Sequence, residues 1–392
     1  MADFDFDTPI DRTGTLSNKW DRAGERFHTR TPLLPFSVAD TDFACPPCVM
    51  DALRHRLEHP IFGYSSAGPE FYQAACGWME RRHQIRLEPA WLWATTGIIT
   101  GLAFALRTVT SPGDRVLTFT PVYNPFFYIV ESAGLELVEC PMTHTAGHYA
   151  LDLNAAERAF RSGIRAVLFC NPHNPTGRVW SREELQELVN LCVQYGVYLI
   201  SDEAHADYAL FGNRYTPIAA FPELHERAVS CIAANKTFNI PGLSAAILVI
   251  PDAALKERVV EALRGVWINT PNILGIVAST AGFSQGDDWL DSQLAYLEDN
   301  SRFLRTFAAE HLPHIQIADH EGTYLMWMDC SCFGMPMGEL SSLLADQYGV
   351  GLPDGSIYRG DGDRHLRINI GCARSLLQQG LEDIVPLYQK RC

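Results

Sequence analysis

Lysine is scarce in this sequence, and one lysine stands in a context suited to chemistry. The chain has 392 residues and only four lysines, Lys19, Lys236, Lys256 and Lys390. Lys236 follows a predicted apolar strand and precedes Phe238. The other three are expected to be exposed to solvent, because Lys19 lies in the N-terminal arm, Lys256 on a charged helix face and Lys390 at the C-terminus. A lysine in a partly desolvated pocket has a lowered pKa, so its amine can form an imine or act as a base. The alternative is a lysine that snorkels from a strand end, and this residue alone leaves both interpretations open.

Two polar residues follow other predicted strands. Asp202 lies in the segment Ser201–His205, where a carboxylate can keep a pyridinium nitrogen protonated through a charge-assisted hydrogen bond. A helix cap or a surface carboxylate is the alternative. Asn174 lies in Asn171–Gly177, a loop fixed by proline and glycine that would hold its amide at the carboxyl edge of a strand. Taken alone, this loop could also be a plain tight turn.

Two further segments can bind anions. Thr95–Ile99 opens an apolar helix that runs to about Thr110, so its free amides and positive dipole end can receive a phosphate. Arg367 stands in the strand-like segment His365–Gly371 and can hold a carboxylate with two parallel hydrogen bonds. A structural salt bridge is the commoner role for an arginine.

The elements that must position these residues are those of an α/β protein. Short apolar runs alternate with helical patterns, which predicts a parallel sheet covered by helices. The predicted strands are Arg115–Thr120, Ala166–Cys170, Val197–Ser201 and Ala228–Ala233. Ser181 and Glu184 predict a capping box before a helix over Leu185–Tyr195. Ligands gather at the carboxyl ends of such strands, where the polar residues stand.

The C-terminal part predicts a smaller α+β domain. It begins with a long helical stretch from about Asp287 to Glu310 and continues with the alternating segments Thr323–Asp329 and His365–Ile370. The whole chain is 47% hydrophobic, enough for a large core.

Composition excludes several classes of partner. The 46 acidic and 31 basic residues give a net charge of −15, which disfavours nucleic acid and anionic membrane surfaces. Apolar runs are too short to span a bilayer, and eleven cysteines in a large chain suit reduced thiols, so a cytoplasmic protein is expected. Cys45 and Cys48 have no second pair to complete a metal site, so none is expected.

The order of the motifs along the chain resembles the fold type I pyridoxal 5'-phosphate (PLP) enzymes of the aminotransferase class I/II group. Within that group the sequence is similar to the MalY/PatB branch of cystathionine β-lyase-like C-S lyases, over nearly its whole length. The segments that carry the resemblance are Ile10–Thr15, Lys19–Asp21, Val38–Phe43, Phe62–Tyr64, Pro121–Phe126, Asn171–Ser181, Ser201–Glu203, Lys236–Ile240, Gly322–Leu325 and Asn369–Cys372.

The resemblance implies an architecture. A large domain would hold a mostly parallel, seven-stranded sheet between helices, beside a smaller α+β domain. Residues 1–45 would form an N-terminal arm and part of the small domain, residues 46–286 the large PLP-binding domain and residues 287–392 the C-terminal small domain.

The resemblance also implies roles at the cofactor ring. Lys236 would form the imine with PLP, Asp202 would pair with the pyridine nitrogen, and Asn174 would hydrogen-bond the phenolic oxygen. Tyr123 would stack on the ring and, with Lys236 and Asp202, complete the catalytic set. His205 stands where many relatives have a tyrosine, and it would also contact the cofactor.

The phosphate would be held by the backbone amides of Gly97, Ile98 and Ile99. Many relatives have a serine three residues before the lysine and an arginine eight after it, where this sequence has Ala233 and Ser244. Binding of the phosphate should therefore depend more on amides, hydroxyls and a partner subunit than it does in those relatives.

The substrate would be bound by Arg367 through its α-carboxylate, together with Ala39, Asn174 and Tyr64. Tyr64 would also reach the phosphate of the neighbouring subunit's cofactor, which implies a homodimer with composite sites.

The function that the resemblance implies is PLP-dependent α,β-elimination from cystathionine or another cysteine S-conjugate, giving pyruvate, ammonia and a thiol. Lys236 would remove the α-proton. A PLP-dependent aminotransferase is the main alternative, and a PLP-binding regulatory or interaction module with incidental catalysis is another. The sequence does not choose among the thioether substrates.

Overall fold

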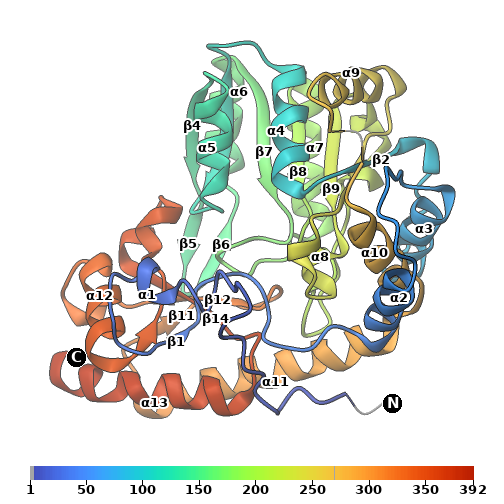
Figure 1. Cartoon of the computed structure of the whole chain (residues 1–392). Coiled ribbons are helices and arrows are strands. Elements are labelled where there is room, and N and C mark those ends of the chain that lie inside the picture. The colour runs from blue at the N-terminus through green and yellow to red at the C-terminus, as the bar shows by residue number, and fades with distance from the viewer. Residues whose placement is uncertain (1–3, 269) are drawn as a thin grey trace.

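A seven-stranded sheet forms the centre of the molecule (Figure 1), and the computed structural model describes residues 4–268 and 270–392. Its strands, in spatial order, are β2 (Leu92–Thr95), β10 (Ala246–Val249), β9 (Ala228–Ile232), β8 (Tyr198–Asp202), β7 (Ile164–Cys170), β3 (Arg115–Thr120) and β4 (Glu136–Pro141). Only β10 runs antiparallel to its neighbours. The four predicted strands and the mostly parallel sheet are confirmed.

Helices cover both faces of this sheet because its central strands are apolar on both sides. In β7, Ala166 and Leu168 pack into one core with α4 (Ile98–Val109), α5 (Pro125–Ser132) and α9 (Ala253–Arg264). Val167 and Phe169 pack into another core with α6 (Leu153–Arg161) and α7 (Arg182–Tyr195). Successive side chains of a strand point to opposite faces, so an uninterrupted apolar run specifies a doubly covered sheet. The predicted capping box of α7 is present, with the Ser181 hydroxyl accepting from the Glu184 amide.

The helices of the chain are α1 (Ala23–Arg26), α2 (Pro47–Leu57), α3 (Pro69–His83), α4 (Ile98–Val109), α5 (Pro125–Ser132), α6 (Leu153–Arg161), α7 (Arg182–Tyr195), α8 (Ala234–Thr237), α9 (Ala253–Arg264), α10 (Ile273–Gln285), α11 (Asp287–His311), α12 (Met337–Tyr348) and α13 (Arg374–Arg391). Short 3-10 turns span Pro89–Trp91, Ile218–Ala220, Pro222–Arg227, Pro241–Leu243, Ser331–Phe333, Gly355–Tyr358 and Gly362–Arg364.

A smaller α+β region lies below the large sheet in Figure 1. It contains a sheet of β11 (Gln316–Ile317), β12 (Leu325–Asp329) and β14 (His365–Asn369), with α11, α12 and α13 around it. The N-terminal segment joins this region, because β1 (Leu34–Pro35) pairs with β13 (Val350–Gly351). A further hairpin consists of β5 (Thr143–Thr145) and β6 (His148–Ala150). The long helix and two strands expected here are confirmed, whereas the domain boundaries at residues 45 and 286 stay predictions.

Lys19 corrects one expectation from the sequence. Its side chain is fully buried, and its Nζ lies 2.6 Å from a carboxylate oxygen of Asp42. The prediction that solvent surrounds Lys19 was wrong because the arm folds back on residues 40–42, a long-range contact that local sequence does not reveal. Lys256 is half-buried and donates to the Ala90 carbonyl, and Lys390 is exposed.

Across the described residues, no helix has the length and apolar character needed to cross a membrane.

Candidate active site

A pocket opens at the carboxyl ends of β7, β8 and β9, next to the start of α4. Nine of the eleven predicted site residues line it: Ala39, Gly97, Ile98, Ile99, Tyr123, Asn174, Asp202, His205 and Lys236. The other lining residues are Thr96, Thr100, Cys170, Ala204, Ala233, Asn235, Pro241 and Ser244. The parallel strands end at one edge of the sheet, which is why residues so distant in sequence meet there.

Lys236 lies on α8, a single turn that directly follows β9. Its Nζ donates to the Ala39 carbonyl oxygen at 2.6 Å. Burial lowers the pKa of the Lys236 amine, Arg367 lowers it further, and the negative charges of Asp40 and Asp202 partly oppose the shift. A lowered pKa increases the share of neutral amine, which is the nucleophilic and basic form.

Asp202 is the last residue of β8 and is 5% exposed. One carboxylate oxygen accepts from the Ala204 amide at 3.0 Å. Burial raises the pKa of Asp202 to about 6, against the lowering effects of that amide and of Lys236. A cationic group placed beside this carboxylate would favour its ionised form.

Two aromatic residues of the pocket are held in their neutral forms. Burial, and next the charge of Asp202, raise the pKa of the Tyr123 hydroxyl to about 12. Burial and the nearby charges of Lys236 and Arg367 lower the pKa of His205 far below its ordinary value. The Nδ1 atom of His205 is buried and has no hydrogen-bond partner among the described residues.

Arg367 lies on β14 of the smaller sheet and contacts a residue that lines the pocket, Asn174. It is 4% exposed, donates to the Asn174 side-chain oxygen at 3.0 Å and to the Ser37 carbonyl, and lies 5.1 Å from the ring centre of Tyr358. Its hydrogen-bond partners are neutral, so these contacts leave its positive charge uncompensated. Within the described chain its Nε has no partner, which leaves a buried donor for an anion.

The start of α4 presents backbone amides to the pocket. Gly97 is the N-terminal cap of this helix and has no side chain to cap it, and among the described residues no side-chain capping hydrogen bond is present. Ile98 and Ile99, both in the first turn, line the pocket beside Thr96 and Thr100. Free amides at the positive end of a helix dipole form a binding site for a phosphate group.

Two predicted site residues do not line the pocket: Arg367, which contacts the lining residue Asn174, and Tyr64, which lies away from it. Tyr64 is fully exposed in a segment without helix or strand.

Sequence reasoning gave no role to Tyr324, whose hydroxyl donates to the Ala39 carbonyl at 2.8 Å. The signal for it was present, because Gly322–Leu325 is one of the segments that carry the resemblance.

The residues of the pocket fit PLP. Lys236 offers an amine for its aldehyde, Asp202 a buried carboxylate for its ring nitrogen, and the first turn of α4 a site for its phosphate. The unpartnered His205 Nδ1 is a buried polar atom that a bound ligand can satisfy.

Comparison with known proteins places this architecture in a family. The family described as Aminotransferase class I and II matches residues 31–384. Cystathionine beta-lyase PatB of Bacillus subtilis is 37% identical over 381 residues, covering 97% of this chain and 98% of that protein. Cystalysin from Treponema denticola, whose crystal structure contains PLP, has a TM-score of 0.95 and 29% identity, over 99% of each chain. A PLP-bound C-S lyase from Staphylococcus hominis has a TM-score of 0.91 and 30% identity, over 98% of each chain.

Proposed function

The chain belongs to the aminotransferase class I and II family, and we propose that it is a PLP-dependent carbon-sulfur β-lyase. Its substrate would be cystathionine or another cysteine S-conjugate, which with one water gives pyruvate, ammonium and a free thiol. The observation that carries this proposal is the similarity to cystathionine β-lyase PatB over 97% of this chain and 98% of that protein. The arrangement of Lys236, Asp202 and Arg367 supports it, because it supplies an amine, a buried acid and a carboxylate site.

The proposed mechanism begins with binding of the substrate α-carboxylate by Arg367, whose guanidinium is buried and has no acidic hydrogen-bond partner among the described residues. Bound in this pocket, PLP supplies the electron sink for the negative charge that develops at Cα. Lys236 removes the Cα proton, a task suited to an amine whose pKa burial has lowered. Asp202 stabilises positive charge at the ring nitrogen from the end of β8.

The leaving sulfur needs a proton. The ammonium of Lys236, formed when it removes the Cα proton, returns that proton to the departing thiolate in this mechanism. The enamine product then hydrolyses in water to pyruvate and ammonium.

A PLP-dependent aminotransferase is the second candidate, favoured by the family to which the chain belongs. It shares carboxylate binding and proton removal from Cα but transfers the amino group to a keto acid instead of expelling sulfur. Incubation of the PLP-loaded protein with L-cystathionine or S-alkyl cysteines, without a keto acid, separates the two. Equal amounts of pyruvate, ammonium and thiol support the lyase, whereas amino transfer that appears only with added keto acid contradicts it.

We further propose that the enzyme is a cytoplasmic homodimer in which Tyr64 completes the phosphate site of the partner. Its full exposure, beside the exposed side chains of Ile61 and Phe62, supports a role outside its own chain. Mixing Tyr64→Ala and Lys236→Ala subunits tests this, because one site of each hybrid dimer would hold both intact residues. Activity above that of either variant supports composite sites, and no gain despite demonstrated subunit exchange contradicts them.

A further inference from the structure

The segment Ser37–Thr41 passes the pocket without belonging to a helix or strand, and side chains from elsewhere hold all five of its carbonyls. The Ser37 carbonyl accepts from Arg367, and the Val38 carbonyl accepts from Asn369. The Ala39 carbonyl accepts from Lys236 and Tyr324. The Asp40 carbonyl accepts from Asn369 and Lys19, and the Thr41 carbonyl accepts from Arg12 and Asn239. A backbone held in this way has its position set by those side chains. The Ala39 carbonyl is thereby fixed next to the reacting amine of Lys236.

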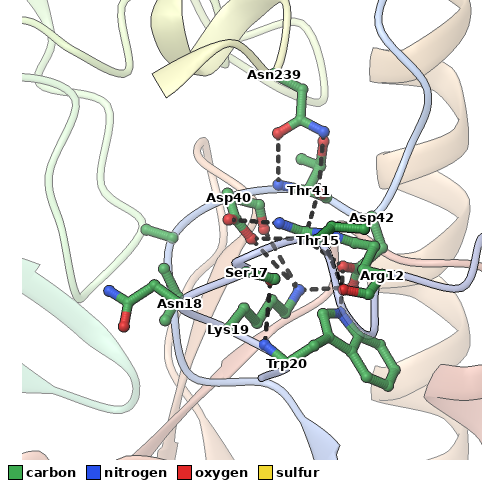
Figure 2. A network of polar contacts seen from close by, with 12 residues as sticks. Arg12, Thr15, Ser17, Asn18, Lys19, Trp20, Asp40, Thr41, Asp42 and Asn239 are labelled. Carbon is green, nitrogen blue, oxygen red and sulfur yellow. Dashed lines mark hydrogen bonds and ion pairs between the residues drawn. The ribbon is translucent and has the colours of Figure 1, made fainter. Parts of the chain in front are cut away.

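Four charged residues fix the far end of this segment (Figure 2). Asp42 accepts from Arg12 at 2.6 Å, from Lys19 at 2.6 Å and from the Trp20 indole at 2.8 Å. Asp40 is held by two parallel hydrogen bonds from Arg12, at 3.0 and 2.9 Å. The two acids and two bases balance in charge, and Lys19 is fully buried among them.

An ion network of this kind, with Lys19 and Asp42 buried and Arg12 and Asp40 partly exposed, is a costly way to gain stability alone. Removing water from charged side chains offsets much of their attraction, and apolar residues of the same volume are often at least as stabilising. Its position has a second consequence, because the same Asp40 that pairs with Arg12 also interacts with the Lys236 amine. The positive charges of Arg12 and Lys19 therefore reduce the negative potential that Asp40 and Asp42 exert on the Lys236 amine.

We propose that Lys19 and Arg12 are positioning residues of the active site, which hold Asp40 and Asp42 so that the Ala39 carbonyl orients the amine of Lys236. In the free-amine form, one N–H of Lys236 donates to Ala39, which restricts the directions in which its lone pair can point. The inference deepens the proposed function and rests on it for the attachment of PLP to Lys236, whereas the identity of the substrate plays no part.

Loss of the Lys19 charge should change the electrostatic potential at the nitrogen of Lys236. The groups that face Lys236 are Asp40 from the arm, Asp202 and His205 after β8, Arg367 on β14 and Tyr324. Removing the positive charge of Lys19 leaves the Arg12, Asp40 and Asp42 cluster with a net charge of −1. This excess stabilises a positive charge on the nitrogen of Lys236.

The test uses the PLP-loaded protein without substrate and measures the pH at which the visible absorbance of the bound cofactor changes. We expect Lys19→Met to raise this midpoint by about half a pH unit or more, which corresponds to about 0.7 kcal/mol. Lys19→Arg should restore the original midpoint, and Lys256→Met, which removes a lysine far from the network, should leave it unchanged. A merely structural role would lower the unfolding temperature without moving the midpoint.

An unchanged midpoint in a folded Lys19→Met protein overturns the inference. If that variant does not fold, Arg12→Gln decides in the same way, because it also leaves the cluster with one excess negative charge. Failure of the inference and of the proposed function are distinguishable. An unmoved midpoint in an active lyase refutes the positioning role alone, and a moved midpoint in a protein that releases no thiol refutes the lyase alone.

Discussion

The guanidinium of Arg367 donates to the side-chain oxygen of Asn174 at 3.0 Å, although 193 positions separate the two residues. Arg367 belongs to the smaller sheet and Asn174 to the loop after β7 of the large one. The proposed carboxylate site and the proposed cofactor site are therefore joined by a buried hydrogen bond. A change at Arg367 is expected to disturb both.

Arg367→Ala should chiefly weaken substrate binding. Removing one side of a buried charged contact costs about 3 kcal/mol, so KM should rise by roughly a hundredfold while kcat changes less. Arg367→Lys is the matched control, because it keeps the charge but cannot form two parallel bonds to a carboxylate. Steady-state kinetics on a thioether substrate measure both parameters, and an unaltered KM in Arg367→Ala would remove this residue from the carboxylate site.

Asp202→Asn should retain the cofactor and lose most activity. The amide has nearly the shape of the carboxylate but no charge to stabilise a protonated ring nitrogen, so kcat should fall by about a hundredfold or more. Absorbance of the bound cofactor reports retention, and product release reports kcat. Turnover equal to that of the unaltered protein would contradict the role assigned to Asp202.

Glu203 should make the folded protein less stable as pH rises. Its carboxyl is 1% exposed, and burial raises its pKa to about 7 from an ordinary value of 4.5, against hydrogen bonds from Tyr215 and the Ile218 amide. The folded state thus binds more protons than the unfolded state between these two values. Because of this group, the free energy of unfolding should fall by about 3 kcal/mol as pH rises from 4.5 to about 7.

Glu203→Gln resembles the protonated side chain and has no proton to lose. Urea unfolding at pH 5 and pH 8 should show a smaller loss of stability in this variant than in the unaltered protein. Equal losses in the two proteins would show that Glu203 does not titrate in this range.

Ser181→Ala should destabilise the protein without affecting the active site. The Ser181 hydroxyl accepts from the Glu184 amide, and the Glu184 side chain accepts from the Ser181 amide, which completes the capping box. Loss of such a cap costs about 1 kcal/mol. Denaturant unfolding measures this cost, with Ser342→Ala on the exposed face of α12 as a control expected to change little. A free energy of unfolding equal in both variants would contradict the prediction.

The large sheet and much of the pocket could be predicted from the sequence because their signals are local. Apolar runs followed by polar residues identify β7 and β8, and the rule that ligands bind at strand carboxyl ends brings Asn174 and Asp202 to one edge. The Ser181 capping box was equally visible, because its residues are three positions apart.

The arm could not be predicted because its interactions join distant residues. The residues around Lys19 in the sequence indicate an exposed side chain. Only the fold shows that the Asp42 carboxylate and the Asp40 carbonyl accept hydrogen bonds from its amine. The contact of Tyr324 with Ala39 spans 285 positions and follows from the pairing of the smaller sheet. The role of Tyr64 depends on a second chain, and the domain boundaries at residues 45 and 286 likewise stay predictions.

Attachment of the cofactor to Lys236 is the central claim, and the scarcity of lysine makes it directly measurable. The PLP-loaded protein is reduced with borohydride, which fixes an imine as a stable amine, and is then digested and analysed by mass spectrometry. The account predicts a pyridoxyl-phosphate adduct on the peptide that contains Lys236 and none on the peptides with Lys19, Lys256 or Lys390. An adduct on one of those three lysines, with Lys236 unmodified, would contradict the account.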